Sequence, residues 1–408
     1  MKRQLYTGSN YKKSININDL ERIAKKRLPN FVFEYVYGGS DDEHTLHHNR
    51  TVFDQYLFEP RTMTKVGTRD LSTTLFDRSY QMPVAIGPTG FNGMLTRDGD
   101  RKLACAARDA NIPFVLSNVS TTAMEDIQAI EGLTAWMQLY FYRDRAFVKS
   151  LIKRCQDARF EAIVITTDSA IYGNREWDVR NFRRPMKPTF ANLAHMMTKP
   201  RWMLDVLLPG LPTFKNLDEL LPPEKRGAQG ASQIIGAQLD PSLNWEDIAW
   251  LRETWPGKII LKGILAPEEA EQAVKLGVDG IVLSNHGGRQ LNHSLSPMDT
   301  LADVKACVGE RCHVFVDSGF RRGTDIIKAL ALGADAVWLG RATLYGLAAG
   351  GQAGAAHALN LLRGEVDRTL GLLGHTNIED LTSAWVVFRI LCHFYPKRKE
   401  VMYDTTNI

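Results

Sequence analysis

Cysteine is scarce in this chain, and its placement excludes two kinds of site. Only five cysteines occur among 408 residues, and no two of them have the CxxC spacing. An odd count without that spacing argues against both a disulfide-stapled scaffold and a cysteine-based metal centre. We therefore expect reduced thiols, no metal site, and a protein that faces the cytosol.

Long apolar runs are also missing. No uninterrupted apolar stretch approaches the ~20 residues that a membrane-spanning helix needs. Residues 1–6 are basic but lead into polar sequence, so no signal peptide is expected. The sequence predicts a protein that does not cross a membrane.

Strong charge is the third absence. The net charge is +4, the calculated pI is 8.7, and no arginine-rich tract occurs. This mild basicity argues against nucleic acid as a partner, but it suits an anionic cofactor, an anionic substrate or an acidic surface. The GxGxxG pattern of dinucleotide-binding folds follows none of the predicted strands.

What the chain does contain is a series of eight short apolar segments, each followed by helix-like sequence. They lie at residues 83–87, 114–117, 136–140, 162–168, 259–263, 280–285, 313–317 and 336–340. Continuous apolar strands that alternate with amphipathic helices indicate a parallel sheet covered on both faces. Eight such units favour an α/β fold of the (β/α)8 TIM-barrel type over an open doubly wound sheet, and we expect one domain over residues 1–408.

Two segments fall outside this pattern. The N-terminal extension includes a predicted helix at 17–26, with Asn18 as N-cap, and an aromatic helix or turn at 31–37. After the fourth strand the chain is far longer than one connection requires. Once a helix opening at Asn244 is assigned to the barrel, an insertion of approximately residues 182–238 remains.

In such a barrel the chemistry lies at the C-terminal strand ends, and residues 284–291 follow one of these ends. They bring His286 close to Arg289, with Gly287 and Gly288 between them. Imidazole accepts a proton near neutral pH and guanidinium binds an anion, so the pair suits deprotonation of a carboxylate-bearing molecule. Asp168 ends another strand and is a candidate to orient the imidazole. The alternative is a rim histidine without a catalytic role.

Two further features suit an anionic cofactor. The glycine-rich turns at 317–323 and 340–341 lie where these barrels commonly hold a phosphate. Lys262 ends the fifth strand in an apolar context, where its charge needs an anion or an electron-rich ring. The alternatives are capped loops with solvated arginines and a lysine that extends to the rim.

Together these motifs resemble the FMN-dependent 2-hydroxy acid dehydrogenase/oxidase family. The matching pieces are residues 87–90, 138–140, 166–168, 262–263, 284–291, 317–323 and 340–341. The resemblance runs from Leu28 to about Gly374 and is closest to the branch of (S)-mandelate dehydrogenase and membrane L-lactate dehydrogenase. It implies an FMN-containing barrel that oxidises an (S)-2-hydroxy acid, mandelate-like or lactate-like, to the 2-oxo acid. A flavin-dependent isomerase and a catalytically silent binding module are the alternatives outside the oxidoreductases.

The resemblance also implies residue roles. Catalysis would involve His286 as the base, with Asp168, Tyr140 and Lys262. The substrate would be bound by Tyr35, Tyr140, Arg175, His286 and Arg289. FMN would be bound by Pro88, Thr89, Gly90, Ser117, Gln138, Thr166, Lys262, Ser284, Asp317, Ser318, Gly319, Arg321, Gly340 and Arg341. Val119 and Tyr172 would shape the side-chain pocket, for an aryl or medium-sized substituent.

In that branch the insertion binds the membrane surface without spanning it, and the interleaved basic and apolar residues of this insertion suit that role. The expected protein is therefore a homotetramer, peripheral on the inner face of the cell membrane, that passes electrons to a quinone. The alternative for the electron acceptor is O2, which would make the protein an oxidase that produces H2O2. The alternatives for the insertion are a mobile lid and a tetramer contact.

Two features depart from the family pattern. Asn292 stands where aspartate is usual, so we expect Arg289 to lack an orienting carboxylate. The C-terminal run 385–391, followed by the basic stretch 396–399, suggests a membrane contact, a subunit contact or a packed tail.

Overall fold

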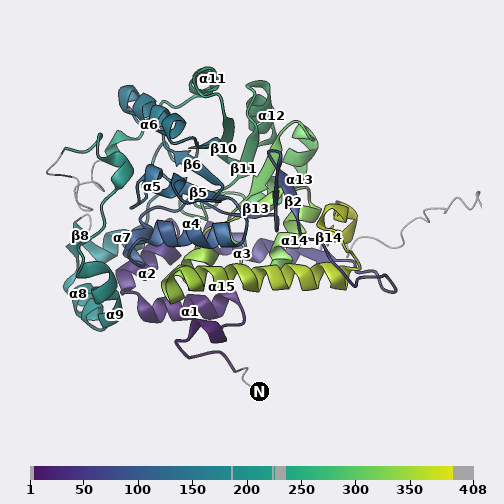
Figure 1. Cartoon of the computed structure of the whole chain (residues 1–408), viewed down its shortest axis with the longest axis horizontal. Coiled ribbons are helices and arrows are strands. Elements are labelled where there is room, and N and C mark those ends of the chain that lie inside the picture. Colours follow the sequence, from purple (N-terminus) through teal and green to yellow (C-terminus); the bar gives the residue numbers. More distant parts are fainter. Residues whose placement is uncertain (1–3, 185–186, 223–224, 226–235, 389–408) are drawn as a thin grey trace, which may run out of the picture.

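The computed structural model describes residues 4–184, 187–222, 225 and 236–388, and its centre is a closed barrel of eight parallel strands (Figure 1). The strands follow one another in chain order around the barrel, and β13 closes it by pairing with β4. Their bounds are β4 Val84–Ile86, β5 Phe114–Ser117, β6 Ala135–Leu139, β7 Ala162–Thr166, β10 Lys258–Ile264, β11 Gly280–Leu283, β12 His313–Val316 and β13 Ala336–Leu339. All eight predicted strands are confirmed, and the closure excludes an open sheet.

Large aromatic side chains fill the inside of the barrel. Trp136, Phe315 and Trp338 pack together with ring centroids 5.5–6.0 Å apart. Phe76 joins them from the turn of a hairpin, β2 Thr73–Leu75 and β3 Arg78–Tyr80, and also contacts the ring of His313 at the start of β12. The hairpin therefore covers the N-terminal ends of the strands and leaves the C-terminal ends as the open mouth.

Amphipathic helices surround the barrel because each buries one apolar face against the strands. They are α4 Gly99–Asp109, α5 Met124–Gln128, α6 Arg145–Asp157, α11 Trp245–Thr254, α12 Pro267–Lys275, α13 Pro297–Val308, α14 Gly323–Ala331 and α15 Arg341–Leu373. The start of α11 is as predicted, since Asn244 caps it in a reciprocal pair with Asp247. The long α15 is broken at Gly350 and Gly351, whose backbone angles are not helical.

The N-terminal extension forms α1 Ile17–Arg27, α2 Asn30–Tyr37 and α3 His44–Thr51. The prediction of Asn18 as N-cap was wrong, because Asn18 lies inside α1 and Asn16 caps it by accepting a hydrogen bond from the Asp19 N–H. Asparagine is favourable at either position by type, but only Asn16 has extended backbone with its side chain turned toward the first turn. Helix α1 lies along α15 (Figure 1).

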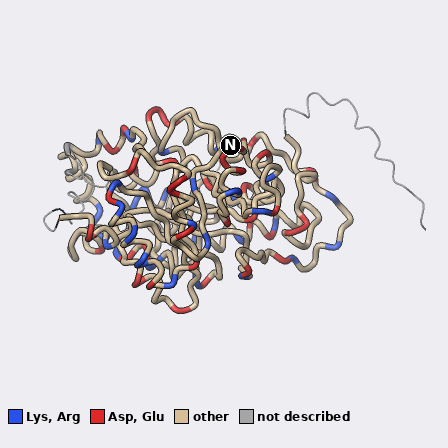
Figure 2. Tube along the Cα trace, turned by 90° about the horizontal axis from the view of Figure 1, so that it is seen from above, with Lys and Arg blue, Asp and Glu red and all other residues tan. Residues whose placement is uncertain are grey.

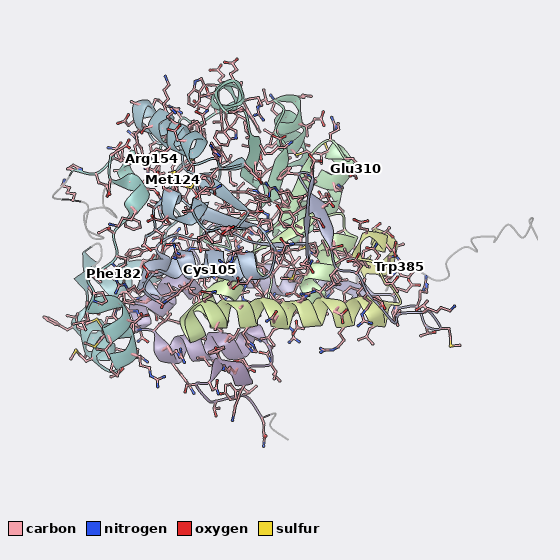
Figure 3. All side chains as sticks on the ribbon, in the orientation of Figure 1. Cys105, Met124, Arg154, Phe182, Glu310 and Trp385 are labelled. Carbon is pink, nitrogen blue, oxygen red and sulfur yellow. The ribbon has the colours of Figure 1, made fainter. Side chains whose placement is uncertain are left out.

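The segment after β7 forms a group of short elements at one end of the molecule (Figure 1). They are α7 Glu176–Asn181, β8 Phe182–Arg184, β9 Lys187–Pro188, α8 Phe190–Met197 and α9 Pro200–Trp202, which continues into a π-helical turn, Met203–Leu207. Phe182 marks this end in Figure 3, opposite Trp385. Over the described ranges, every helix is too short or too polar to cross a membrane.

The described part of the C-terminal run is a packed tail. Strand β14, Val386–Phe388, pairs antiparallel with β1, Tyr56–Phe58, and the rings of Tyr56 and Phe388 lie 5.3 Å apart. Residues 389–391 and 396–399 lie outside the described residues.

Six short 3-10 turns complete the described elements: Tyr11–Lys13, Val52–Gln55, Asn92–Met94, Lys215–Leu217, Ile378–Asp380 and Ser383–Trp385. Acidic and basic residues are interspersed along the chain rather than segregated by sign (Figure 2).

Candidate active site

A cavity with about 1130 Å³ of empty volume, including its open mouth, lies at the C-terminal ends of the strands. The predicted site residues that line it are Tyr35, Pro88, Thr89, Gly90, Ser117, Gln138, Tyr140, Thr166, Arg175, Lys262, His286, Arg289, Asp317, Ser318, Gly319, Arg321, Gly340 and Arg341. The remaining two lie directly behind the wall, where Ser284 is bonded to Lys262 and Asp168 to His286. The structure therefore brings all the predicted residues together.

The loop after β11 presents the imidazole of His286 to this cavity. The backbone of His286 is left-handed (φ 58°), and its N–H donates to Ser284 Oγ at 3.0 Å. Its Nδ1 lies 3.0 Å from Asp168 Oδ1 and 3.3 Å from Ser169 Oγ. A carboxylate at Nδ1 selects the tautomer that carries its proton there, so Nε2 is left as a proton acceptor.

The surroundings also set the charge states of this pair. Burial lowers the pKa of His286, although the charge of Asp168 opposes the effect. Burial alone would raise the pKa of Asp168, but the charges of His286 and Lys262 and the hydrogen bonds to this carboxyl hold it below its usual value. At neutral pH the pair is therefore an uncharged imidazole beside a carboxylate.

Gly263, at the end of β10, makes this arrangement possible. Its φ is +115°, and a Cβ added there would lie 2.8 Å from Asp168 Cβ and 2.9 Å from the Asp168 backbone nitrogen. Both the backbone angle and the close approach require glycine.

Arg289 is held by the N-terminal extension. Its Nη1 donates to the carbonyl oxygens of Tyr35 at 2.7 Å and Gly38 at 2.8 Å, and its guanidinium lies 5.2 Å from the centre of the Tyr35 ring. Asn292 bonds instead to Asp42 and to the Thr45 N–H. As expected, Arg289 has no orienting carboxylate at position 292, and backbone carbonyls take that role.

The cavity has more positive charge than its own residues neutralise. Arg175, Arg289, Arg321 and Arg341 all line it, and none forms an ion pair with a carboxylate of the described residues. Burial lowers the pKa of Arg289 and of Arg341, and the charges of nearby arginines add to the effect. The buried Nε of Arg175 has no hydrogen-bond partner within the described ranges. Such a site favours anionic ligands.

A row of polar side chains runs across the C-terminal ends of strands β5, β6, β7, β10 and β11. Ser117 donates to Gln138 Oε1 at 2.8 Å, and Gln138 Nε2 donates to Thr166 Oγ1 at 2.9 Å. Buried Lys262 continues the row, with its Nζ 2.7 Å from Ser284 Oγ and 2.9 Å from Asp317 Oδ2. Donors and acceptors alternate here, as the heteroatoms of a planar polar ring would require.

Residues 24–388 match the family described as FMN-dependent dehydrogenase. The chain belongs to this family. It is 42% identical over 368 residues to (S)-mandelate dehydrogenase of Pseudomonas putida, which covers 90% of this chain and 92% of that protein. It is 37% identical over 364 residues to L-lactate dehydrogenase of Allorhizobium ampelinum, which covers 89% and 96% respectively.

The fold is also similar to that of a solved member of the same family. The crystal structure of the monotopic membrane protein (S)-mandelate dehydrogenase matches with a TM-score of 0.88 at 40% identity, covering 92% of this chain and 100% of that one.

The cavity of this FMN-dependent dehydrogenase fits its cofactor. FMN is a polar ring joined to a phosphate, and the cavity has a polar row at one part and Arg321 and Arg341 at another. Open space lies beside Gly340, where an added Cβ would meet nothing nearer than Thr89 Cγ2 at 4.0 Å. Guanidinium groups and free backbone approach are the usual means of holding a phosphate.

Sequence reasoning missed three residues that support the site. The carbonyls of Val36 and Gly38 accept hydrogen bonds from Arg341, and the side chain of Gln290 bonds to the backbone of residues 168–173. Backbone carbonyls leave no signal in residue type, so the contacts from α2 were not predictable. Gln290 lies inside the 284–291 motif, and its place in that motif was the one sequence signal that could have identified it as a site residue.

Proposed function

We propose that this FMN-dependent dehydrogenase oxidises an (S)-2-hydroxy acid to the corresponding 2-oxo acid. The observation that carries the proposal is the partly buried His286–Asp168 pair in one cavity with Arg175 and Arg289, two guanidinium groups that form no ion pair with the described residues. A proton acceptor next to a carboxylate clamp suits an acid that must lose a proton at or beside its Cα.

The positions of the residues in the cavity support the following roles. Arg175 and Arg289 bind the substrate carboxylate, and the hydroxyls of Tyr35 and Tyr140 bind the substrate as hydrogen-bond partners. Nε2 of His286 accepts a proton from the substrate, and Asp168 stabilises the imidazolium that results. Bound FMN supplies the two-electron acceptor for this reaction.

The cofactor is bound along the polar row and at the arginine end. We assign the ring to Ser117, Gln138, Thr166, Lys262 and Ser284, with Pro88, Thr89 and Gly90 facing it. The phosphate end is assigned to Ser318, Gly319, Arg321, Gly340 and Arg341, with Asp317 between the two ends.

The substrate side chain lies between Val119 and Tyr172, which both line the cavity. Val119 is small and leaves room, while the ring of Tyr172 lies beneath the guanidinium of Arg175, 5.7 Å from it. We infer a 2-hydroxy acid with an aryl or medium-sized substituent, as the name of the mandelate relative also suggests.

The electron acceptor we propose is a membrane quinone, reached from the cytoplasmic face of the membrane. Ten of the eighteen exposed large apolar side chains in the described ranges lie between residues 171 and 211: Ile171, Tyr172, Trp177, Val179, Phe190, Leu193, Met197, Leu204, Leu208 and Leu211. The last six of these belong to the insertion. Exposed apolar side chains concentrated in one stretch suit contact with a lipid surface. The matched solved structure is named as a monotopic membrane protein. A homotetramer is proposed from the family resemblance and is tested by the mass of the purified particle.

The decisive experiment is anaerobic mixing of the FMN-loaded protein with lactate, mandelate and longer 2-hydroxy acids. Bleaching of the flavin absorbance is expected, fastest with mandelate-like acids. His286→Ala should keep its FMN yet fail to bleach, whereas normal bleaching in that variant would end the assignment. Rapid O2 consumption without quinone reduction would make the protein an oxidase instead.

A further inference from the structure

A second cavity, with about 780 Å³ of empty volume, lies where α1, α9 and α15 meet. Residues 198–202 and Asp205 of the insertion line it, and its inner wall is apolar, formed in part by Leu28, Trp202 and Leu347. Leu95 lines both this cavity and the active-site cavity. Trp202 fixes this geometry by donating from Nε1 to the carbonyl of Met94 at 2.7 Å.

The rim of this second cavity is strongly basic. Four cationic side chains line it, namely Lys26, Arg27, Lys199 and Arg201, against the single carboxylate of Asp205. One oxygen of that carboxylate, Oδ2, accepts hydrogen bonds from Thr96 Oγ1 at 2.6 Å and from the Arg97 N–H at 3.3 Å. None of the four cations forms an ion pair within the part of the chain that the structure describes.

Two of these cations have donors that no described residue uses. The Nε of Arg27 is buried and has no hydrogen-bond partner among the described residues, while its Nη2 donates to the Ser9 carbonyl at 3.3 Å. Lys199 Nζ makes one bond, to the Lys26 carbonyl at 2.8 Å. Burial lowers the pKa of both groups, and for Arg27 the charge of Arg201 lowers it further. An oxyanion bound between Arg27 and Lys199 would offset the unfavourable burial of both positive charges.

We propose that this second cavity binds the phosphate of an anionic lipid headgroup. Free phosphate has the same oxyanion as a lipid headgroup. A lipid can in addition contact the apolar wall of the cavity and the exposed apolar side chains of the insertion. The inference rests on the proposed membrane contact and extends it, because it assigns the contact to named residues and to one class of lipid. A headgroup bound here lies one side chain, Leu95, from the active-site cavity.

Calorimetry on the FMN-loaded protein tests the site directly. One arm titrates a short-chain phosphatidylglycerol below its micelle concentration, and the other titrates inorganic phosphate. We expect the lipid to bind and the double variant Arg27→Gln/Lys199→Gln to bind it about 100-fold more weakly, about tenfold for each charge-assisted bond lost. Arg27→Lys, which keeps the charge but loses Nε, should weaken binding about tenfold.

The matched control is Lys65→Gln/Lys275→Gln, which removes the same charge from exposed positions that do not line the cavity. It should change lipid binding less than twofold. Equal weakening in the two double variants would mean general charge attraction and would overturn the site. Inorganic phosphate that binds as tightly as the lipid would overturn the lipid assignment, and so would a wild-type protein that binds neither.

Flavin bleaching in the same preparations separates this inference from the proposed function. Normal bleaching by a 2-hydroxy acid without lipid binding defeats only the lipid site. Lipid binding that the cavity variants abolish, in a protein that no 2-hydroxy acid bleaches, supports the site and defeats the proposed oxidation. FMN content and thermal unfolding verify that the double variant is folded, and Arg27→Lys decides the question if it is not.

Discussion

Replacing Asp168 with asparagine tests how the carboxylate acts on the imidazole. The change keeps the size of the side chain but removes the charge 3.0 Å from His286 Nδ1. A hydrogen bond to a charged group contributes about 1.5–3 kcal/mol, so its loss alone should slow flavin reduction about 10- to 150-fold. The rate should fall further if the amide introduced by Asp168→Asn donates to Nδ1. That bond selects the tautomer with its proton on Nε2, and Nε2 then cannot accept the proton of the substrate.

The pH profile separates this role from a structural one. Burial lowers the pKa of His286 below its ordinary value of about 6.5, and the charge of Asp168 opposes that shift. In the wild type, the rate of flavin reduction at low substrate concentration should therefore rise with pH through a pKa below about 6.5 and then level off. Without the carboxylate this inflection should move to still lower pH.

Anaerobic stopped-flow measurement of flavin reduction between pH 4.5 and 8 gives both quantities. FMN content should be unchanged, because Asp168 lies behind the cavity wall. The matched control is Asp299→Asn, which removes a carboxylate 2.8 Å from His48 outside the cavity and should leave the rate and the pH profile as they are. A wild-type rate with an unshifted profile in Asp168→Asn would refute the reasoning.

Three further predictions concern stability, measured by urea unfolding. Gly263→Ala should lower the free energy of unfolding by about 1–3 kcal/mol more than Gly210→Ala does. Both glycines have a positive φ, but only at Gly263 would the added Cβ lie within 2.9 Å of Asp168. Equal losses of stability would mean that backbone strain is the whole effect. Lys262→Met should destabilise by about 3–5 kcal/mol by leaving Asp317 without its partner, and adding Asp317→Asn should restore part of that loss; no restoration would mean that the pair is not coupled. Since the pKa of Asp168 is lowered on folding, its contribution is present above about pH 4 and is lost as the pH falls through the folded value, so Asp168→Asn should lose less stability than the wild type on acidification; parallel pH curves would contradict this.

Much of the fold could be predicted because the strands are buried on both faces. Residues 162–165 and 280–283 carry no polar side chain, which is the pattern that a strand covered on both faces requires. Their count and the helices between them then favoured a closed barrel, whose C-terminal ends must bring together residues such as Lys262 and His286. The N-cap of α1 was misplaced because two asparagines lie two residues apart and only backbone geometry distinguishes them.

The sequence by itself determined which strand-end residues meet at the mouth, because the residues that follow each apolar segment are a local property of the chain and the ends of parallel barrel strands lie together. Only the tertiary structure decided how they are held: Arg289 and Arg341 by carbonyls of α2, and Asp168 by the space that Gly263 leaves. It alone also joined Arg27 and Lys199, which are 172 positions apart, around one cavity. Contacts through backbone atoms, and contacts between segments distant in the chain, depend on packing in three dimensions and leave no pattern in residue type.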